Sequence, residues 1–180
     1  MDKRLDRAFE RLKAWPTAVS VANTDKEDCP LIYVNDAFTA LSGYGSDECI
    51  GRNCRFLQGD QTDPVAVEKL RKSVIDKSQI SVCLLNYRRD GTPFHNLLVM
   101  APIDFTDHRH LIMGCQYEIQ RAISDSQIQA QLANVHGAFR QIERPHDPNW
   151  RLFSDSVETR TVATRMLVDS YMFRAPSIAR

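Results

Sequence analysis

The sequence predicts one α+β domain, with a short helix before it and helical segments after it. Two long apolar segments, residues 79–88 and 92–103, flank the dipeptide Asp90-Gly91, which is a strong signal for a β-hairpin. A third long apolar segment, residues 110–118, follows directly. Shorter strand and helix patterns precede these three segments. Strands, then small helices, then antiparallel strands are typical of the α+β class.

The first elements of the chain are small and sharply bounded. Residues 3–14 place apolar side chains at helical spacing between charged ones, and this predicts an amphipathic helix that ends before Pro16. Residues 17–23 and 31–34 have the composition of strands, and the polar residues 24–28 between them predict a turn.

Two helix starts follow the second strand. Asn35 is expected to cap a small helix that contains Phe38 and Leu41. At Asp63-Pro64, a residue suited to the N-cap precedes a proline suited to the first helical position. This helix is expected to run to about residue 75. Its apolar face is expected to carry Val67, Leu70 and Val74.

The tail has a different pattern. Apolar residues step by 4, 3, 4 and 3 positions, which is a heptad stripe. They are Ile128, Leu132, Val135, Phe139 and Ile142. The segment 145–148 contains two prolines and breaks this stripe, and a second helical segment is expected at about 156–173.

Length, charge and cysteine usage narrow the class of protein. The 180 residues fit one domain with flanking elements, and 23 basic against 23 acidic residues argue against a nucleic-acid surface or a polybasic membrane anchor. No apolar run approaches the roughly 20 residues that span a bilayer, and the start lacks the apolar core of a signal peptide. Five cysteines without metal-ligand spacing argue against a disulfide framework or zinc site. We therefore expect a cytoplasmic protein.

One run of residues points to a bound ligand. In Gly51–Gly59, the thiol of Cys54 lies between the amide of Asn53 and the guanidinium of Arg55, and Gln58 follows. This mixture suits a polar ligand with a phosphate group and a reactive face. The run is similar, residue for residue, to the flavin-binding motif of the LOV (light, oxygen, voltage) photoreceptors.

The resemblance covers about residues 17–122 and implies the PAS fold, a five-stranded antiparallel sheet with small helices across one face. It divides the chain into an N-terminal helix (1–16), a sensor domain (17–122) and a C-terminal helical extension (123–180). The whole looks like a bacterial short LOV protein. The resemblance further implies that the Cys54 sulfur bonds reversibly to carbon C4a of a photoexcited flavin, whose N5 gains a proton. Such a protein is a blue-light sensor and not an enzyme.

The resemblance also assigns the flavin contacts. Arg55 and Arg71 match the arginines that hold the phosphate, and guanidinium groups suit that task because they form charge-assisted bidentate hydrogen bonds. Asn53 and Gln58 would face the ribityl chain. LOV proteins that bind FAD usually carry an insertion that makes room for the adenylate, and the segment between Gly59 and Asp63 lacks it. The resemblance therefore favours FMN, with riboflavin or mixed loading left open.

Three amides are expected at the flavin ring edge. They are Asn86, Asn96 and Gln116. Each interrupts an apolar strand, and a buried amide without a partner costs about 1 to 3 kcal/mol, so three on neighbouring strands need a polar ligand or one another. The candidate apolar walls are Val19, Val21, Leu57, Leu70, Leu85, Leu97 and Leu98. His95, where the family commonly has Trp, is expected on the opposite face by strand alternation.

The resemblance implies that signalling begins at Gln116, whose amide would rotate when N5 is protonated. The stripe 128–142 and the helix 5–12 are expected to form a homodimer that changes with light, and a separate signalling partner stays open. Three other readings compete: a flavin-binding PAS module that senses redox state, a dimerisation PAS domain without cofactor, and a flavoenzyme. The positioned thiol argues against the first, and the lack of an arranged acid or base argues against the last.

Overall fold

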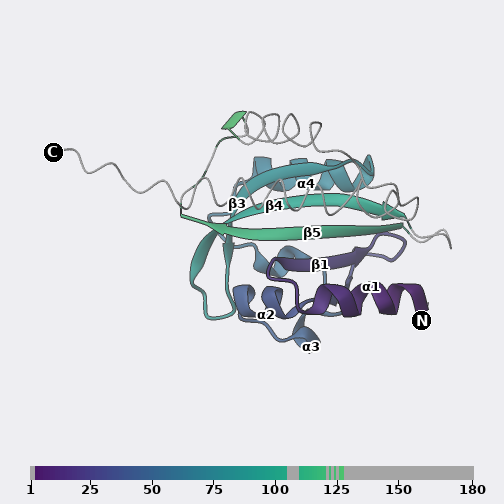
Figure 1. Cartoon of the computed structure of the whole chain (residues 1–180). Coiled ribbons are helices and arrows are strands. Elements are labelled where there is room, and N and C mark those ends of the chain that lie inside the picture. Colours follow the sequence, from purple (N-terminus) through teal and green to yellow (C-terminus); the bar gives the residue numbers. More distant parts are fainter. Residues whose placement is uncertain (1–2, 105–109, 121, 123, 125, 128–180) are drawn as a thin grey trace, which may run out of the picture. The chain divides into compact units, whose positions relative to one another are not determined.

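The computed structural model describes residues 3–104, 110–120, 122, 124 and 126–127. Its centre is a five-stranded sheet with the order β2-β1-β5-β4-β3 (Figure 1). The strands are β1 (Ala18–Asn23), β2 (Leu31–Val34), β3 (Ile80–Tyr87), β4 (Pro93–Asp104) and β5 (His110–Ile119). All the strands predicted from the sequence are present, each within two residues of its expected bounds. The expected helical segments 128–142 and 156–173 lie outside the described residues.

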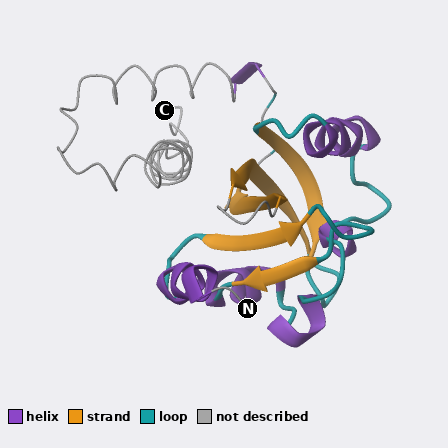
Figure 2. Ribbon diagram, turned by 90° about the vertical axis from the view of Figure 1, so that its right-hand side faces the viewer, coloured by secondary structure: helices purple, strands orange, loops and turns teal. Residues whose placement is uncertain are grey.

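The helices of the described part are short and precede β3 in the chain, on which α4 packs (Figures 1 and 2). They are α1 (Lys3–Lys13), α2 (Asp36–Ser42), α3 (Ser46–Cys49), the 3₁₀ helix η1 (Cys54–Leu57) and α4 (Pro64–Ile75). The predicted caps are confirmed. Asn35 Oδ1 accepts from the Phe38 amide at 3.0 Å, and Asp63 Oδ1 accepts from the Val65 amide at 2.9 Å.

The buried face of α4 differs from the prediction. The buried residues are Ala66 and Ser73, whereas the three residues expected on that face are only half-buried. Ala66 packs with Val82 and Leu84 of β3. Small side chains at 66 and 73, two turns apart, let the helix approach the strand closely, so the contact face is rotated by one residue. The larger apolar side chains then lie along its margin.

One face of the sheet carries the three amides predicted at the ring edge, and we call it the inner face. Two separate apolar clusters flank these amides on it. The first joins Ala18 of β1 to α2, α3 and η1 through Phe38, Cys49 and Leu57, and the second joins α4 to β3. The middle of the inner face is therefore polar, between two apolar ends.

Helix α1 is fixed to the sheet by one asparagine. Asn35 Nδ2 donates to the carbonyls of Leu12 at 3.1 Å and Thr17 at 2.8 Å, and its Oδ1 accepts from the Val19 amide at 2.8 Å. The Phe9 ring also stacks on Tyr33 of β2, with 4.2 Å between the centroids. The helix expected to take part in a dimer is thus engaged within its own chain.

Candidate functional site

Asn86, Asn96 and Gln116 form a row across the inner face, one from each of β3, β4 and β5, and we call it the amide row. All three side chains are buried. Asn96 Nδ2 donates to Asn86 Oδ1 at 2.8 Å, and Gln116 Nε2 donates to Ser20 Oγ of β1 at 2.8 Å. Strands that are distant in sequence therefore present one continuous polar strip.

The amide row has hydrogen-bonding capacity left over. The side-chain oxygens Asn96 Oδ1 and Gln116 Oε1 are buried and have no hydrogen-bond partner in the described part of the chain. Each such acceptor costs about 1 to 3 kcal/mol, and a ligand that brings N–H donors to the row removes that cost. The chemistry of the row therefore suits a ligand that carries an N–H donor on its edge.

Gly114 leaves room for the Gln116 side chain because it has no side chain of its own. A Cβ built on it would lie 3.0 Å from Gln116 Nε2, 3.1 Å from Ser20 Oγ and 3.2 Å from Leu98 Cδ1. A larger residue would therefore press on the Gln116–Ser20 hydrogen bond. Sequence reasoning missed both Ser20 and Gly114, because one serine or glycine in an apolar strand is a weak signal.

The turn that carries Cys54 is tied to both edges of the sheet. On one side, the Gly51 amide donates to the Leu31 carbonyl of β2 and the Leu31 amide donates to the Arg52 carbonyl, both at 2.8 Å. On the other side, Thr62 Oγ1 donates to the Leu85 carbonyl of β3 at 2.6 Å. Because β2 and β3 are the two edge strands, the segment between these ties has to cross the sheet.

Gly59 ends the motif against β3. A Cβ at this position would overlap the Tyr87 ring, so only glycine fits without a shift. The Tyr87 hydroxyl in turn accepts from the Gln61 amide at 3.3 Å. The glycine that closes the motif therefore lets the chain lie flat on β3.

Cys54 starts η1 and packs against the first inner-face cluster, near Leu57 and the fully buried Cys49. Its side chain is half-buried. Loss of hydration, with a smaller contribution from Cys49, raises the pKa of the Cys54 thiol to about 12. The sulfur is therefore a neutral thiol at physiological pH and not a thiolate nucleophile.

Asp28 holds the polar residues on either side of Cys54. Its carbonyl accepts from Asn53 Nδ2 at 2.6 Å, and its carboxylate forms an ion pair with Arg55. Asn53 Oδ1 also caps η1 by accepting from the Arg55 amide at 2.9 Å. Asp28 has a φ of 63° and Cys29 has one of 46°, values that are rare for residues other than glycine. This left-handed turn was not predicted.

The two arginines expected at a phosphate pair with different carboxylates. Arg55 and its partner Asp28 are exposed, and Arg71 lies 3.7 Å from Glu68 on the surface of α4. Gln58 ends η1 and is half-buried. No hydrogen bond or ion pair within the described part of the chain joins these three side chains, so their common role stays a prediction.

The expected apolar walls divide between the two faces. Leu57 and Leu70 pack in the inner-face clusters, and Leu98 points to Gly114 on the inner face. Val21 lies on the opposite face, because it alternates with Ser20, whose hydroxyl bonds Gln116. The same alternation places Val19, Leu85, Leu97 and His95 on that opposite face.

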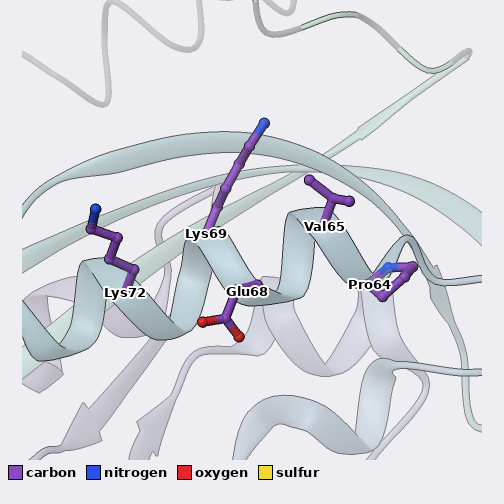
Figure 3. A pocket seen from close by; sticks show the side chains of 5 residues that line it. All are labelled: Pro64, Val65, Glu68, Lys69 and Lys72. Atoms are coloured by element: carbon purple, nitrogen blue, oxygen red, sulfur yellow. The ribbon is translucent and has the colours of Figure 1, made fainter.

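A hollow of about 380 Å³ lies elsewhere, on the surface of α4 (Figure 3). It is lined by Pro64, Val65, Glu68, Lys69 and Lys72. None of these residues belongs to the predicted site, and the amide row contributes nothing to it.

The described residues contain neither a membrane-spanning helix nor a metal-binding cluster. No helix among them is long and apolar enough to cross a membrane. No group of three or more His, Cys, Asp or Glu side chains within that part of the chain is arranged to hold a metal ion.

Comparison with known proteins places the chain among sensor domains. The PAS domain family model matches residues 16–121. Blue-light-activated histidine kinase 2 of Erythrobacter litoralis is 38% identical over 130 residues, which are 68% of this chain and 38% of that protein. The blue-light photoreceptor of Listeria monocytogenes is 39% identical over 117 residues, 64% of this chain and 46% of that protein. The chain thus matches less than half the length of each.

A solved structure agrees with these sequence matches. It is the LOV domain of a blue-light activated histidine kinase from Erythrobacter litoralis, with 40% identity and a TM-score of 0.56. The match covers 59% of this chain and 98% of that domain. The chain therefore belongs to the PAS domain family and, within it, to the LOV domains.

Proposed function

We propose that this protein is a blue-light sensor that holds a flavin against the inner face of its sheet. The observation that carries the proposal is the pair of buried, unpartnered oxygens in the amide row, Asn96 Oδ1 and Gln116 Oε1. An oxidised flavin ring edge offers one N–H donor, at N3, beside carbonyl and ring-nitrogen acceptors, and N5 becomes a second donor after light. Amide side chains, which both donate and accept, match such an edge. The blue-light relatives with 38% and 39% identity support the same assignment.

The residues that would hold the flavin come from three parts of the chain. The amide row takes the ring edge, Asn53 and Gln58 take the ribityl chain, and Leu57 and Leu98 supply apolar contacts. Arg55 and Arg71 take a phosphate, and FMN is therefore the flavin that this set suits. Both arginines are exposed, so they can exchange a carboxylate partner for a phosphate without breaking buried structure.

Cys54 is the reacting side chain. When bound, the flavin would supply the blue-light absorption and the electrophilic carbon C4a. Cys54 Sγ would bond reversibly to that carbon while the thiol proton passes to N5. The raised pKa keeps Sγ protonated in the dark, so the thiol is held unreactive until light arrives. The two sheet-edge ties of its turn hold Sγ in a fixed place. No substrate is consumed, and the protein acts as a sensor and not as an enzyme.

Gln116 transmits the change at the flavin to β5. Its Nε2 donates to Ser20 while its Oε1 has no partner, so a rotation of the amide exchanges donor and acceptor at little structural cost. Gln116 lies near the end of β5, the last strand before the tail. A changed hydrogen bond there biases an element with two arrangements, which is how such switches work.

Replacing the thiol tests the proposal. In Cys54→Ala, the purified protein should keep its flavin and lose the reversible bleaching of the blue absorption band under blue light. Cys83→Ala is the matched control, since Cys83 pairs with Leu97 and lies on the opposite face of β3. It should bleach and recover as the unchanged protein does. Bleaching that persists in Cys54→Ala would remove Cys54 from the mechanism.

The tail is proposed to form a light-dependent homodimer through the heptad-spaced residues 128–142. Because α1 is engaged within its own chain, the proposal now rests on the tail alone. Size-exclusion profiles in the dark and under blue light should differ, and truncation after residue 127 should abolish the difference. Profiles that show a monomer in both conditions refute the dimer and leave the photochemistry untouched.

A further inference from the structure

Arg88 joins three elements at the end of the sheet where β5 finishes. One guanidinium nitrogen donates to the Leu41 carbonyl in the last turn of α2, and Arg88 NH2 lies 2.7 Å from Glu118 Oε1 of β5. The guanidinium carbon also stands 4.8 Å from the centre of the Phe94 ring of β4. A cation at a helix C-terminus, beside a carboxylate and over an aromatic ring, has three favourable interactions at once.

These residues form a second row beside the amide row. Arg88, Phe94 and Glu118 each lie two positions from an amide-row residue, namely Asn86, Asn96 and Gln116. Side chains two apart on a strand share a face, so this second row continues the inner face by one step. Phe94 is also the partner of Asn86 in the β3–β4 register. Through its ion pair with Glu118, Arg88 is therefore joined to the segment of β5 that also carries Gln116.

The next residue, Arg89, forms a comparable ion pair with α3 and not with β5. Arg89 Nε lies 2.9 Å from Glu48 Oε1 of α3, and the two side chains are 61% and 36% exposed. The Arg88 and Glu118 side chains are 23% and 49% exposed. Two adjacent residues thus hold two carboxylates, and only Arg88 reaches β5.

We propose that Arg88 is a positioning residue that holds the end of β5 in the dark and loosens its hold on Glu118 after light. The inference rests on the proposed function, because the light event at Gln116 is part of it. A partly exposed ion pair is weak enough for a small displacement of the strand to change its occupancy. A deeply buried pair would be too costly to break and could not serve as a switch. In the described part of the chain, the hydrogen bonds, ion pair and ring contact of the Arg88 side chain go to Leu41, Glu118 and Phe94 and not to the proposed flavin-binding side chains. Arg88 therefore acts on the output and not on the photochemistry.

Hydrogen exchange of the end of β5 tests the inference. Arg88→Met keeps an unbranched stem that can cover Phe94 and removes the charge. In the dark, amides in a peptide that covers residues 114–120 should exchange roughly threefold faster than in the unchanged protein, as expected for a lost ion pair of this exposure. Light should accelerate exchange in the unchanged protein and add almost nothing in the variant, whose strand end is already released.

Arg89→Met is the matched control, and it should exchange as the unchanged protein does in dark and light. Glu118→Gln leaves the strand composition nearly intact and should reproduce the effect of Arg88→Met, and the double variant should add nothing further. All variants should still bleach under blue light. If Arg88→Met bleaches and keeps a normal light-minus-dark difference, the inference is overturned and the proposed function stands. If the unchanged protein does not bleach, both fall.

Discussion

Asn35 and Asn96 have the same side chain and the same 1% exposure, yet their surroundings are opposite. Asn35 Oδ1 accepts from two backbone amides, and its Nδ2 donates to the carbonyls of Leu12, Trp15 and Thr17. Asn96 Nδ2 has one partner, Asn86, and its Oδ1 has none in the described part of the chain. The first amide is saturated by the protein itself, and the second is not.

The difference separates an amide that the chain itself saturates from one that has hydrogen-bonding capacity left for a ligand. A buried polar group whose capacity is filled by its own chain stabilises the fold around it. A buried group with unfilled capacity costs stability until a ligand supplies the missing partner. In this chain the saturated asparagine joins α1, β1 and α2, whereas the unsaturated amides face the middle of the inner face.

The largest expected effect is on the structural amide. Asn35→Leu leaves the amides of Val19 and Phe38 without their acceptor, and it also frees three carbonyls. The free energy of unfolding should fall by about 3 kcal/mol or more, as expected when several buried hydrogen bonds are broken together. Urea unfolding monitored by circular dichroism measures this. A loss below about 1 kcal/mol would mean that Asn35 is not the joint described above.

Substitutions in the amide row should not lower the free energy of unfolding of the flavin-free protein and can raise it by removing an unsatisfied acceptor. In the double variant Asn86→Leu/Asn96→Leu, the flavin-free protein should be as stable as the unchanged one within about 1 kcal/mol, or more stable, because an unsatisfied acceptor is removed. Flavin affinity should fall roughly 30-fold or more, since two contacts to the ring edge are lost and each is worth about 1 to 3 kcal/mol. Fluorescence titration with FMN and urea unfolding give the two numbers. An unchanged affinity would contradict the role of the amide row.

The smallest effect concerns the half-buried Cys54 thiol, whose charged form the protein leaves poorly hydrated. Its pKa is raised from 9.0 to about 12, so the folded state keeps the proton to higher pH than the unfolded chain does. The stability from this difference is complete below pH 9 and is lost as pH rises from 9 toward 12. Between pH 9 and pH 10, the unchanged protein should lose about 1 kcal/mol more than Cys54→Ala. Tyr33, whose pKa is also raised to about 12, is present in both proteins and cancels. Parallel stability curves would refute the burial of the thiol.

The three residues of the amide row could be selected from the sequence because each is a polar residue inside an apolar strand. Asn86, Asn96 and Gln116 were predicted on one face, and the structure places them there. The caps at Asn35 and Asp63 were also readable, since capping depends on residues within the same turn. Such features depend on residues that are close in the sequence, so tertiary packing does not alter them.

The errors arose where both faces of an element are apolar. Val19 and Val21 are each fully buried, so the alternation of β1 gave no clue that Ser20 and not Val21 faces Gln116. In α4, the small residues Ala66 and Ser73 displace larger apolar ones from the contact face. The ties of Asp28 to Asn53 and Arg55 span more than twenty positions through a left-handed turn, which no local pattern announces.

The central claim is that the inner face holds a flavin within reach of Cys54. The most direct measurement is the visible absorption of the purified protein in darkness, after a blue flash, and during return to darkness. The account predicts a yellow protein whose blue band bleaches with the flash and recovers completely without added reagents. Two results would contradict a flavin held near Cys54: a protein that stays colourless after incubation with FMN, or a yellow protein whose spectrum does not change after the flash.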